Sequence, residues 1–308
     1  MLATTFWLVR MVCFWRRFQL KWEYYEIPQI PMGEEHPLAM YELPKAHFYK
    51  VKNLIQDGHP YPEVLSVIEG NHPGWIFADD LEIPRTALIW SQGIGGFYLI
   101  GDPDNPIFID ELDRYITEQI VPRMKAFKMN YFEVSGHHRN WNMKAIFPSR
   151  ELQQWEQLVF SSGSLKAVTL NEADDRFKTL SLRSREWRTQ SFSNREFVEQ
   201  HIDSFWKTRE DFLEKGYGYI ALEGEQITGV CYSSFVTTDT HAIGIETLGN
   251  YQKQGVGFQL ARLVAKEISY NGYSVYWDCS LDNEASRKLA NRLGLQQVYR
   301  YTCVGFTI

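Results

Sequence analysis

The sequence contains few cysteines, and no two of them are closely spaced. The four are Cys13, Cys231, Cys279 and Cys303, and none belongs to a Cys-x-x-Cys motif. A small disulfide scaffold carries cysteines at higher density, and a zinc knuckle carries them in close pairs. The cysteine content therefore excludes both classes and predicts a protein of the reducing cytoplasm.

The chain also lacks an excess of basic residues. It has 32 lysines and arginines against 38 aspartates and glutamates, a formal net charge of -6 and a pI near 5.8. Because the nucleic-acid backbone is polyanionic, a protein that binds it needs a basic face. The charge balance thus argues against nucleic acid as a partner.

Long hydrophobic runs are missing, even at the unusual start of the chain. Residues 1–20 hold two short apolar runs that Arg10 separates. A signal peptide places its charges before the apolar run, and a membrane span needs about 20 uninterrupted apolar residues, so a membrane location is not expected. Residues 1–40 could be a basic, aromatic interfacial anchor. We favour a misassigned translation start, with Met32 or Met40 as the true beginning.

Apolar residues are nevertheless plentiful, and they follow one pattern twice. Hydrophobic residues make up 44% of the 308 residues, enough for two domains with cores of their own. The first half predicts strands at 75–77, 86–90 and 96–101, a helix at 109–127, a strand at 131–134, a helix near 141–146 and a strand at 154–160. The second half predicts strands at 219–222, 227–235 and 241–248, a helix at 256–270, a strand at 273–279, a helix at 283–293 and a strand at 298–306.

The repeated order of elements predicts an internal duplication. An α/β fold with a mixed sheet (α+β) is expected, with two related units in tandem at residues 41–162 and 165–308. Small residues at 161–164 would form the linker.

The most informative feature of the second unit is a turn that joins a strand to a helix. It consists of Gln252, Lys253, Gln254, Gly255, Val256 and Gly257. Because glycine has no side chain, the backbone can approach a ligand closely, and the first N–H groups of the helix point outward. These donors and the positive end of the helix dipole favour a diphosphate. A plain glycine turn before a helix is the alternative interpretation.

A second motif follows, where a helix begins at Asn283-Glu284-Ala285-Ser286 and ends at Gly294. With both motifs in this order, the second unit resembles the GNAT superfamily of acyl-CoA-dependent N-acyltransferases. The signatures of that superfamily are (Q/R)-x-x-G-x-(G/A) and N-x-x-(A/S). The sequence segments at 244–247, 277–279 and 286–290 are similar to those of a bacterial subgroup that includes the zwittermicin A resistance acetyltransferases.

The resemblance implies acetyl-CoA as the acyl donor and an amine-bearing small molecule or peptide as the acceptor. The amine would attack the thioester directly, and a backbone N–H of Thr247 or Leu248 would polarise its carbonyl. The glycine turn would bind the diphosphate, with Asn283 and Ser286 near the CoA arm; capping of their own helix is the other role for these two. A non-catalytic CoA-binding or regulatory protein is the alternative function.

Two carboxylates are candidates for the chemistry. Glu246 is expected at the carboxyl end of a strand beside the glycine turn, where it would act as the general base unless it is merely solvated or paired. Asp278 lies on the strand that should separate from the Glu246 strand. It would bind the cationic amine, act as the base, or cap the turn near Asn283.

The sequence departs from the family at one catalytic position. Many family members have a tyrosine there as the general acid for the leaving thiolate, and this chain has Ala290. Either the thiolate leaves without a dedicated acid or another tyrosine, such as Tyr299 or Tyr301, supplies the proton.

Three further features have ordinary interpretations. Cys279 in an apolar strand is expected to be an inert packing residue and not a nucleophile. His137 and His138 have no third ligand at metal spacing and are expected in a surface turn, so no metal site is predicted. The aromatic helical pattern at 193–212 is expected to pack in the core, and a ligand-facing role, which the resemblance implies for this region, is the alternative.

The first unit lacks the glycine turn at the corresponding place. Residues 101–106 read Gly-Asp-Pro-Asp-Asn-Pro. Proline has no N–H and two aspartates repel a phosphate, so this unit is expected to be degenerate and not to bind CoA.

Overall fold

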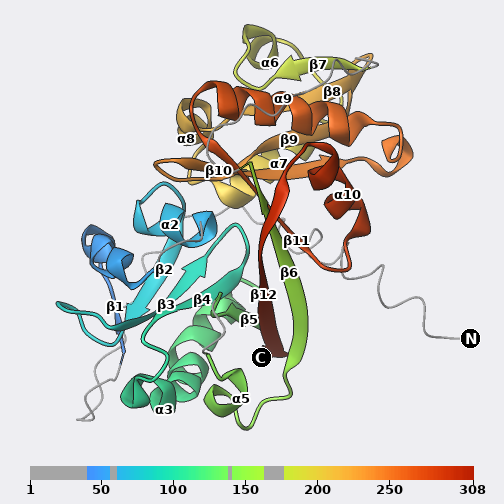
Figure 1. The fold of residues 1–308 in the computed structure, drawn as a ribbon. Helices are drawn as coiled ribbons and strands as arrows, with labels where there is room; N and C mark the ends of the chain where they lie inside the picture. The colour runs from blue at the N-terminus through green and yellow to red at the C-terminus, as the bar shows by residue number, and fades with distance from the viewer. Residues whose placement is uncertain (1–39, 56–60, 138–140, 163–176) are drawn as a thin grey trace, which may run out of the picture.

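The computed structural model describes residues 40–55, 61–137, 141–162 and 177–308. Within them the protein forms one mixed sheet of 12 strands with helices against it (Figure 1). The predicted α/β mixed-sheet class is therefore confirmed. Both hypotheses about the start of the chain, and half of the predicted linker, fall outside the described residues; Ser161, at the start of that linker, is the last residue of a strand.

The first half contains the predicted series of elements, preceded by three short ones. In chain order these are β1 (Tyr41–Glu42), η1 (Lys45–Leu54), α2 (Pro62–Ile68), β2 (Gly74–Ala78), β3 (Thr86–Ser91), β4 (Gly96–Gly101), α3 (Pro106–Tyr115), η2 (Ile116–Ile120), α4 (Val121–Ala126), β5 (Tyr131–Ser135), α5 (Met143–Ile146) and β6 (Gln153–Ser161). The predicted helix at 109–127 is interrupted by the π-helical η2. The interruption fits Pro122, which has no N–H for a regular helical bond.

The second half repeats this order. Its elements are β7 (Lys178–Ser181), α6 (Arg185–Thr189), α7 (Arg195–Phe205), α8 (Arg209–Lys215), β8 (Gly218–Glu223), β9 (Gln226–Val236), β10 (Thr240–Thr247), η3 (Gly249–Tyr251), α9 (Val256–Tyr270), β11 (Ser274–Ser280), α10 (Glu284–Arg292) and β12 (Gln296–Thr307). With β1 and β7 included, each half therefore supplies six strands.

The predicted helix at 193–212 is two helices, which corrects the sequence interpretation. Trp206 leaves the helical conformation after α7, and its buried indole N–H donates to the carbonyl of Ser233 at 2.9 Å. Thr208 then caps the new helix α8 by accepting from the N–H of Asp211. The expected core role is confirmed, since His201 and Phe212 are only 4% and 2% exposed.

The two halves exchange their last strands. The strand order is β1-β2-β3-β4-β5-β12-β6-β11-β10-β9-β8-β7, so β12 lies between β5 and β6, and β6 lies between β12 and β11. Val159 of β6 is paired with Asp278 of β11, and Cys303 of β12 is paired with Ser135 of β5. Each half therefore completes its part of the sheet with a strand from the other, as the centre of Figure 1 shows.

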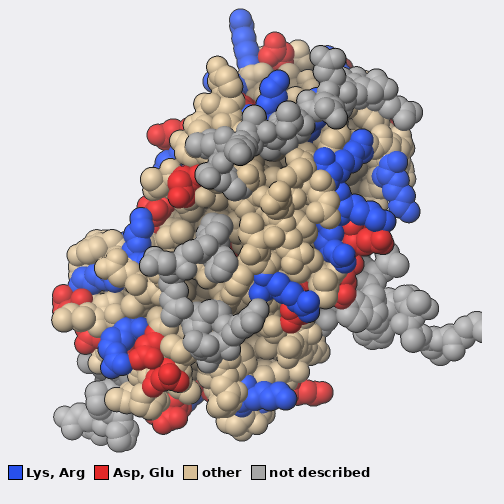
Figure 2. Space-filling view, in the orientation of Figure 1, with Lys and Arg blue, Asp and Glu red and all other residues tan. Residues whose placement is uncertain are grey.

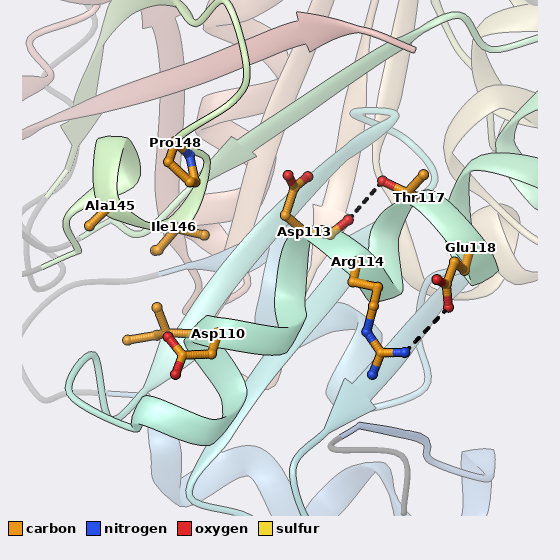
Figure 3. A pocket seen from close by; sticks show the side chains of 9 residues that line it. Asp110, Asp113, Arg114, Thr117, Glu118, Ala145, Ile146 and Pro148 are labelled. Carbon is orange, nitrogen blue, oxygen red and sulfur yellow. Dashed lines mark hydrogen bonds and ion pairs between the residues drawn. The ribbon is translucent and has the colours of Figure 1, made fainter. Parts of the chain in front are cut away.

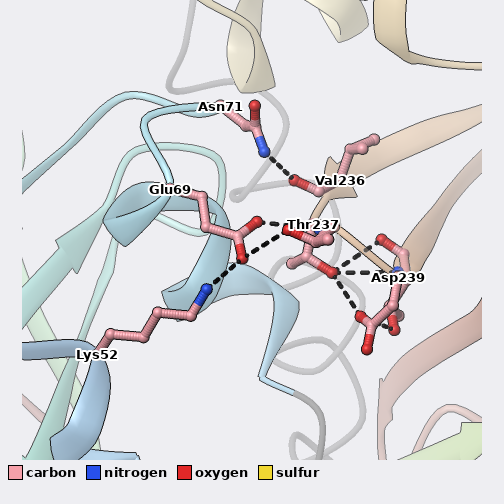
Figure 4. A network of polar contacts seen from close by, with 8 residues as sticks. Lys52, Glu69, Asn71, Val236, Thr237 and Asp239 are labelled. Carbon is pink, nitrogen blue, oxygen red and sulfur yellow. Dashed lines mark hydrogen bonds and ion pairs between the residues drawn. The ribbon is translucent and has the colours of Figure 1, made fainter. Parts of the chain in front are cut away.

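A network of polar contacts also joins the halves (Figure 4). Glu69, just after α2, binds Lys52 and accepts from the backbone N–H of Thr238 in the second half. Nearby, the side-chain amide of Asn71 donates to the carbonyl of Val236 at 3.0 Å. The contacts fix the first half against the β9–β10 hairpin.

The surface carries charges of both signs. On the face in Figure 2, lysine and arginine side chains are interspersed with aspartate and glutamate. Among the described residues, no helix combines the length and the apolar character that crossing a membrane requires.

Candidate functional site

The site begins where two neighbouring parallel strands separate. β10 and β11 are paired only at Thr240 with Ser274, His241 with Val275, and Ala242 with Tyr276. Beyond these pairs β10 continues along β9, after an irregularity at Ala242, while β11 continues along β6. The facing edges of the two strands thus diverge, as the resemblance predicts. We call this region the β10–β11 separation.

The glycine turn lies at the end of β10 and leads into α9. Gly255 precedes the helix with φ 92°, a left-handed conformation that favours glycine, and no side chain caps the helix. Val256 is fully buried and anchors the first turn of α9 in the core. The start of α9 therefore presents backbone N–H groups without a side-chain cap, as an anion site requires.

Gly257 lies where β10, α9 and α10 meet. A Cβ atom at this position would stand 3.5 Å from Ile245 Cδ1 and Thr247 Oγ1, and 3.7 Å from Leu289 Cδ2. Any larger side chain would enter the space between these elements. The absence of a side chain at Gly257 therefore keeps the approach to the β10–β11 separation open.

The polar side chains of the turn stabilise its backbone. The side-chain amide of Gln252 donates to the carbonyl of Thr247 at 3.2 Å, and that of Gln254 donates to the carbonyl of Asn250 at 2.8 Å. Lys253 is exposed and has φ 60°. These contacts hold the turn in shape and leave Lys253 facing solvent.

The two expected carbonyl-polarising donors differ in their surroundings. The N–H of Leu248 donates to the carbonyl of Thr228 at 2.9 Å and is therefore already used within the sheet. Burial raises the pKa of the Glu246 carboxyl, and the backbone N–H of Thr247 partly offsets this rise. Successive N–H groups of a strand point to opposite sides. The backbone N–H of Thr247 therefore points away from β9, toward the β10–β11 separation.

Glu246 and Asp278 lie on the same face of the sheet. Ile245 of β10 and Trp277 of β11 pack in the core beneath α9, so the neighbouring side chains point to the opposite face. Glu246 is partly buried, and this burial raises the pKa of its carboxyl above the ordinary value of 4.5. A carboxylate of this kind is a better proton acceptor near neutral pH.

Asp278 has one satisfied and one unsatisfied carboxylate oxygen. The hydroxyl of Tyr301 donates to Oδ2, while Oδ1 is buried without a hydrogen-bond partner among the described residues. Burial, and then the nearby carboxylate of Glu63, raise the pKa of Asp278 well above its ordinary range. Asp278 does not cap the turn near Asn283, which was one of the three roles considered for it.

Asn283 and Ser286 both make local contacts. The carbonyl oxygen of the Asn283 side chain accepts from the N–H of Ser286 at 3.0 Å and caps α10. The hydroxyl of Ser286 accepts from the indole N–H of Trp277 at 2.9 Å. The two residues fasten α10 to β11, on the same side of the sheet as α9.

His137 corrects the sequence interpretation. It was expected in a surface turn, but it is 7% exposed, and its Nε2 lies 2.6 Å from Oε1 of the buried Glu63. The hydroxyl of Tyr276, on β11, donates to the same Glu63 oxygen at 3.5 Å. The first half therefore contributes a buried polar pair beside β11. His138 lies outside the described residues.

Sequence reasoning missed Glu63 because it missed helix α2. The available signal was a proline at a helix start, since Pro62 and Glu63 open a run of apolar residues. That signal identifies the helix, but it does not identify the partner of the carboxylate, which comes from the end of β5.

Ala290 and Cys279 have the passive positions expected of them. Ala290 is fully buried among α9 and β11, and no tyrosine replaces it on α10. Burial raises the pKa of Cys279 to about 11, so its thiol is protonated near neutral pH and is a poor nucleophile. Of the two alternative tyrosines, Tyr301 is the one that contacts Asp278.

A hollow of about 420 Å³ lies elsewhere, on the outside of the first half (Figure 3). It is lined by Asp110, Asp113 and Glu118 of the α3 region and by Ile146 and Pro148 at α5. None of the residues that line it belongs to the glycine turn, to β10 or to β11. The chemistry of the motifs therefore belongs to the β10–β11 separation and not to this hollow.

Comparison with known proteins agrees with this geometry. The model of the GNAT acetyltransferase family matches residues 53–304. The chain is 26% identical over 266 residues to YdfB, an uncharacterised N-acetyltransferase of Bacillus subtilis (strain 168). The alignment covers 86% of this chain and 97% of that protein.

Two solved structures share the fold across both halves. A GCN5-related N-acetyltransferase-like protein from Streptococcus suis 89/1591 has a TM-score of 0.57 and 19% identity, over 85% of this chain and 98% of that one. A tandem GNAT protein from the clavulanic acid biosynthesis pathway has a TM-score of 0.56 and 8% identity, over 87% of this chain and 98% of that one. Since the family match spans most of the chain, including both halves, this protein belongs to the GNAT acetyltransferase family.

Proposed function

We propose that residues 165–308 form a catalytic unit that transfers an acetyl group from acetyl-CoA to a primary amine. The observation that carries the proposal is the β10–β11 separation beside the glycine turn of α9, which no side chain caps. An extended thioester arm with amide groups suits the diverging strand edges, and a diphosphate suits the start of the helix.

The turn residues Gln252, Lys253, Gln254, Gly255, Val256 and Gly257 would bind the diphosphate of acetyl-CoA. Backbone N–H groups at the start of α9 would supply the hydrogen bonds, and the exposed Lys253 would add a positive charge. Asn283 and Ser286 would border the CoA arm from α10 while they keep their structural contacts. The space beside Gly257 fits this arrangement, because a Cβ there would meet no atom closer than 3.5 Å.

The reaction would be a direct transfer. The amine nitrogen forms a bond to the thioester carbon, the carbon–sulfur bond breaks, and the CoA thiolate leaves. Glu246 takes the proton that the nitrogen loses, and the N–H of Thr247 polarises the thioester carbonyl. The high pKa of Cys279 supports direct transfer over an acyl-cysteine intermediate.

The first half would support the catalytic unit without binding CoA itself. Similarity of the phrases at 244–247, 277–279 and 286–290 to the zwittermicin A resistance subgroup suggests an antibiotic-like amine as the acceptor. The unbridged Cys231, Cys279 and Cys303 suit a reducing cytoplasm. A non-catalytic CoA-binding protein is the second candidate, because burial raises the pKa of Asp278, one of the two carboxylates of the site, well above its ordinary range.

Isothermal titration of acetyl-CoA into the purified protein tests the first step. One binding site per chain, lost in Gly255→Trp, is the expected result. Since a Cβ at Gly255 would meet no atom within 4 Å, this variant acts through its φ of 92° and its bulk at the ligand. Absence of binding in the wild type would contradict both candidate functions.

A screen of primary amines then separates the two candidates. Release of free CoA thiol in the presence of an amine, at a rate that Glu246→Gln lowers, is expected of the enzyme. Tight binding of acetyl-CoA without turnover of any amine would favour the non-catalytic alternative.

A further inference from the structure

Two buried hydrogen-bond acceptors near the proposed active site have no donor. Oδ1 of Asp278 and Oε1 of Gln157 each expose less than 1 Å² and have no partner among the described residues. A buried polar atom without a partner costs about 1 to 3 kcal/mol, so such atoms are uncommon in folded proteins. Two of them close together indicate a donor that arrives with a ligand.

The two side chains are close because of the strand exchange. Asp278 of β11 is paired with Val159 of β6, and Ser280 is paired with Gln157, so Asp278 and Gln157 are diagonal neighbours on one face. Diagonal neighbours in an antiparallel pair have Cβ atoms roughly 7 to 8 Å apart. One small donor group can reach both acceptors across that distance.

The surroundings favour a cationic donor. Tyr301, opposite Gln157 on β12, already uses its hydroxyl on Oδ2 of Asp278. Burial is the largest effect that opposes the ionisation of Asp278, and the carboxylates of Glu63 and Glu133 add to it. The hydroxyls of Tyr301 and Tyr276 act in the other direction. A positive charge at Oδ1 would restore a paired carboxylate, which is the state in which buried charges are stable.

Asp278 and Gln157 lie at a different distance along the strands from Glu246, the proposed base. Asp278 is two residues beyond Tyr276, the last β11 residue paired with β10, whereas Glu246 is four residues beyond Ala242, the last paired residue of β10. A difference of two residues corresponds to about 7 Å along a strand. A nitrogen bound at Asp278 and a nitrogen that loses its proton to Glu246 therefore occupy different places.

We propose that Asp278 and Gln157 bind an ammonium group of the acceptor other than the amine that attacks, so that the acceptor is a diamine or polyamine. The proposal rests on the proposed acetyl transfer and names its substrate class. An ammonium held by two acceptors keeps its proton and has no lone pair for attack, so a second nitrogen must react.

The first half of the chain acquires a role through this site. Gln157 lies on β6, and Glu63 with His137 closes the same region through the hydroxyl of Tyr276. The first half has no CoA-binding turn of its own, but it completes the acceptor site of the second half. The specificity of the enzyme is therefore built from both halves.

Steady-state kinetics with pentylamine and 1,5-diaminopentane tests the proposal, because the two differ by one terminal amino group. In the wild type, kcat/KM is expected to be at least about 10-fold higher for the diamine. Asp278→Asn and Gln157→Leu are each expected to lower the diamine-to-monoamine ratio at least about 10-fold, mainly through KM. Near-ultraviolet circular dichroism checks that both variants are folded.

Matched control variants remove the same groups elsewhere. Asp110 is an exposed residue of α3, and Gln154 is an exposed residue of β6 that is paired with Val304 of β12; the controls are Asp110→Asn and Gln154→Leu. Both are expected to keep the wild-type ratio. A wild-type ratio near one, or a ratio that neither site variant changes, would overturn the inference while leaving acetyl transfer intact.

A binding measurement separates failure of the inference from failure of the function. If neither amine is acetylated, calorimetry with 1,5-diaminopentane alone decides. Binding that Asp278→Asn abolishes and Asp110→Asn preserves supports the cation site even without turnover. No binding of the diamine to the wild type overturns it.

Discussion

The starts of α3 and α9 occupy the same place in the two halves, yet their chemistry is opposite. Before α3, the Asn105 side chain accepts from the N–H of Phe108 at 3.3 Å and donates to Asp79 at 2.8 Å and to Thr86 at 3.0 Å. Pro106 removes another N–H from the same turn. The first helix start is satisfied by its own neighbours, whereas α9 has no side-chain cap. An internal cap and a ligand site are thus alternative uses of one position.

The space between the parallel strands beside these helices also differs between the two halves. In the first half, β4 and β5 are paired at Phe97 with Val134 and at Tyr98 with Ser135. The space beyond that pairing is a hollow of only about 10 Å³, lined by Tyr61 and His137 among others. Aromatic side chains of the first half therefore fill the region that corresponds to the β10–β11 separation. The first half therefore differs from the second in the space between its strands as well as in the turn before its helix.

Filling the β10–β11 separation should make the second half resemble the first. The loss of acetyl-CoA affinity is the largest effect that we expect. Gly257→Leu would place a side chain among Ile245, Thr247 and Leu289, where the CoA arm is proposed to pass. The dissociation constant of acetyl-CoA, measured by calorimetry, should rise at least about 100-fold. Gly224→Ala, in the β8–β9 turn and open to solvent, should leave binding unchanged. Unaltered affinity in Gly257→Leu would exclude this path for the ligand.

Removal of the proposed base should lower turnover without loss of acetyl-CoA binding. Glu246→Gln is expected to reduce kcat about 100-fold or more. Because burial raises the Glu246 pKa above 4.5, the carboxylate is protonated as the pH falls through that raised value, and wild-type kcat/KM should fall with it. The variant should lose this acid limb of the pH profile. Glu225→Gln, on the exposed β8–β9 turn, should retain the acid limb. If Glu246→Gln also retains the acid limb, another group must be the base.

The junction between the halves should weaken in acid through His72. Its Nδ1–H donates to the carbonyl of Phe205, and its Nε2 accepts from the N–H of Val236, so the neutral ring suits both contacts. Burial lowers the pKa of His72 from 6.5 to about 4. The unfolded chain therefore binds the proton first, and stability present above pH 6.5 is lost as the pH falls toward 4.

The loss due to His72 should be on the order of 3 kcal/mol in the free energy of unfolding, measured by urea denaturation across this pH range. His72→Asn should flatten the profile by that amount, whereas His47→Asn, on η1, should change it little. An equally steep profile in His72→Asn would assign the acid sensitivity to other groups, such as the buried His201 and His241.

The smallest effect is expected from the cap that closes the first helix. Asn105→Ala removes the cap and leaves Thr86 and Asp79 without their shared partner, at a cost of about 1 to 2 kcal/mol in stability. Affinity for acetyl-CoA should stay the same, because the first half is not expected to bind it. Asn142→Ala, the cap of the exposed α5, provides the matched control and should cost less. A new acetyl-CoA site in Asn105→Ala would contradict the degenerate status of the first half.

Local patterns were sufficient to predict most elements of both halves. The predicted strand at 86–90 is β3, and the predicted helix at 256–270 is α9, because alternating and helical apolar periodicities extend over enough residues. Short elements without such a pattern, α2 and α6 among them, were missed. The break between α7 and α8 was missed as well, since burial of Trp206 overrides a continuous helical pattern.

The sequence alone determined the α/β class, the duplication, and the place of the glycine turn and of Glu246, because these follow from the periodicity and order of neighbouring residues. Only the tertiary structure decided that β6 and β12 change places, that Asp278 binds Tyr301, and that Gln157 is its diagonal neighbour on the sheet. These contacts join residues far apart in the chain. Packing of the whole sheet selects them, and no local pattern records which strands will be neighbours.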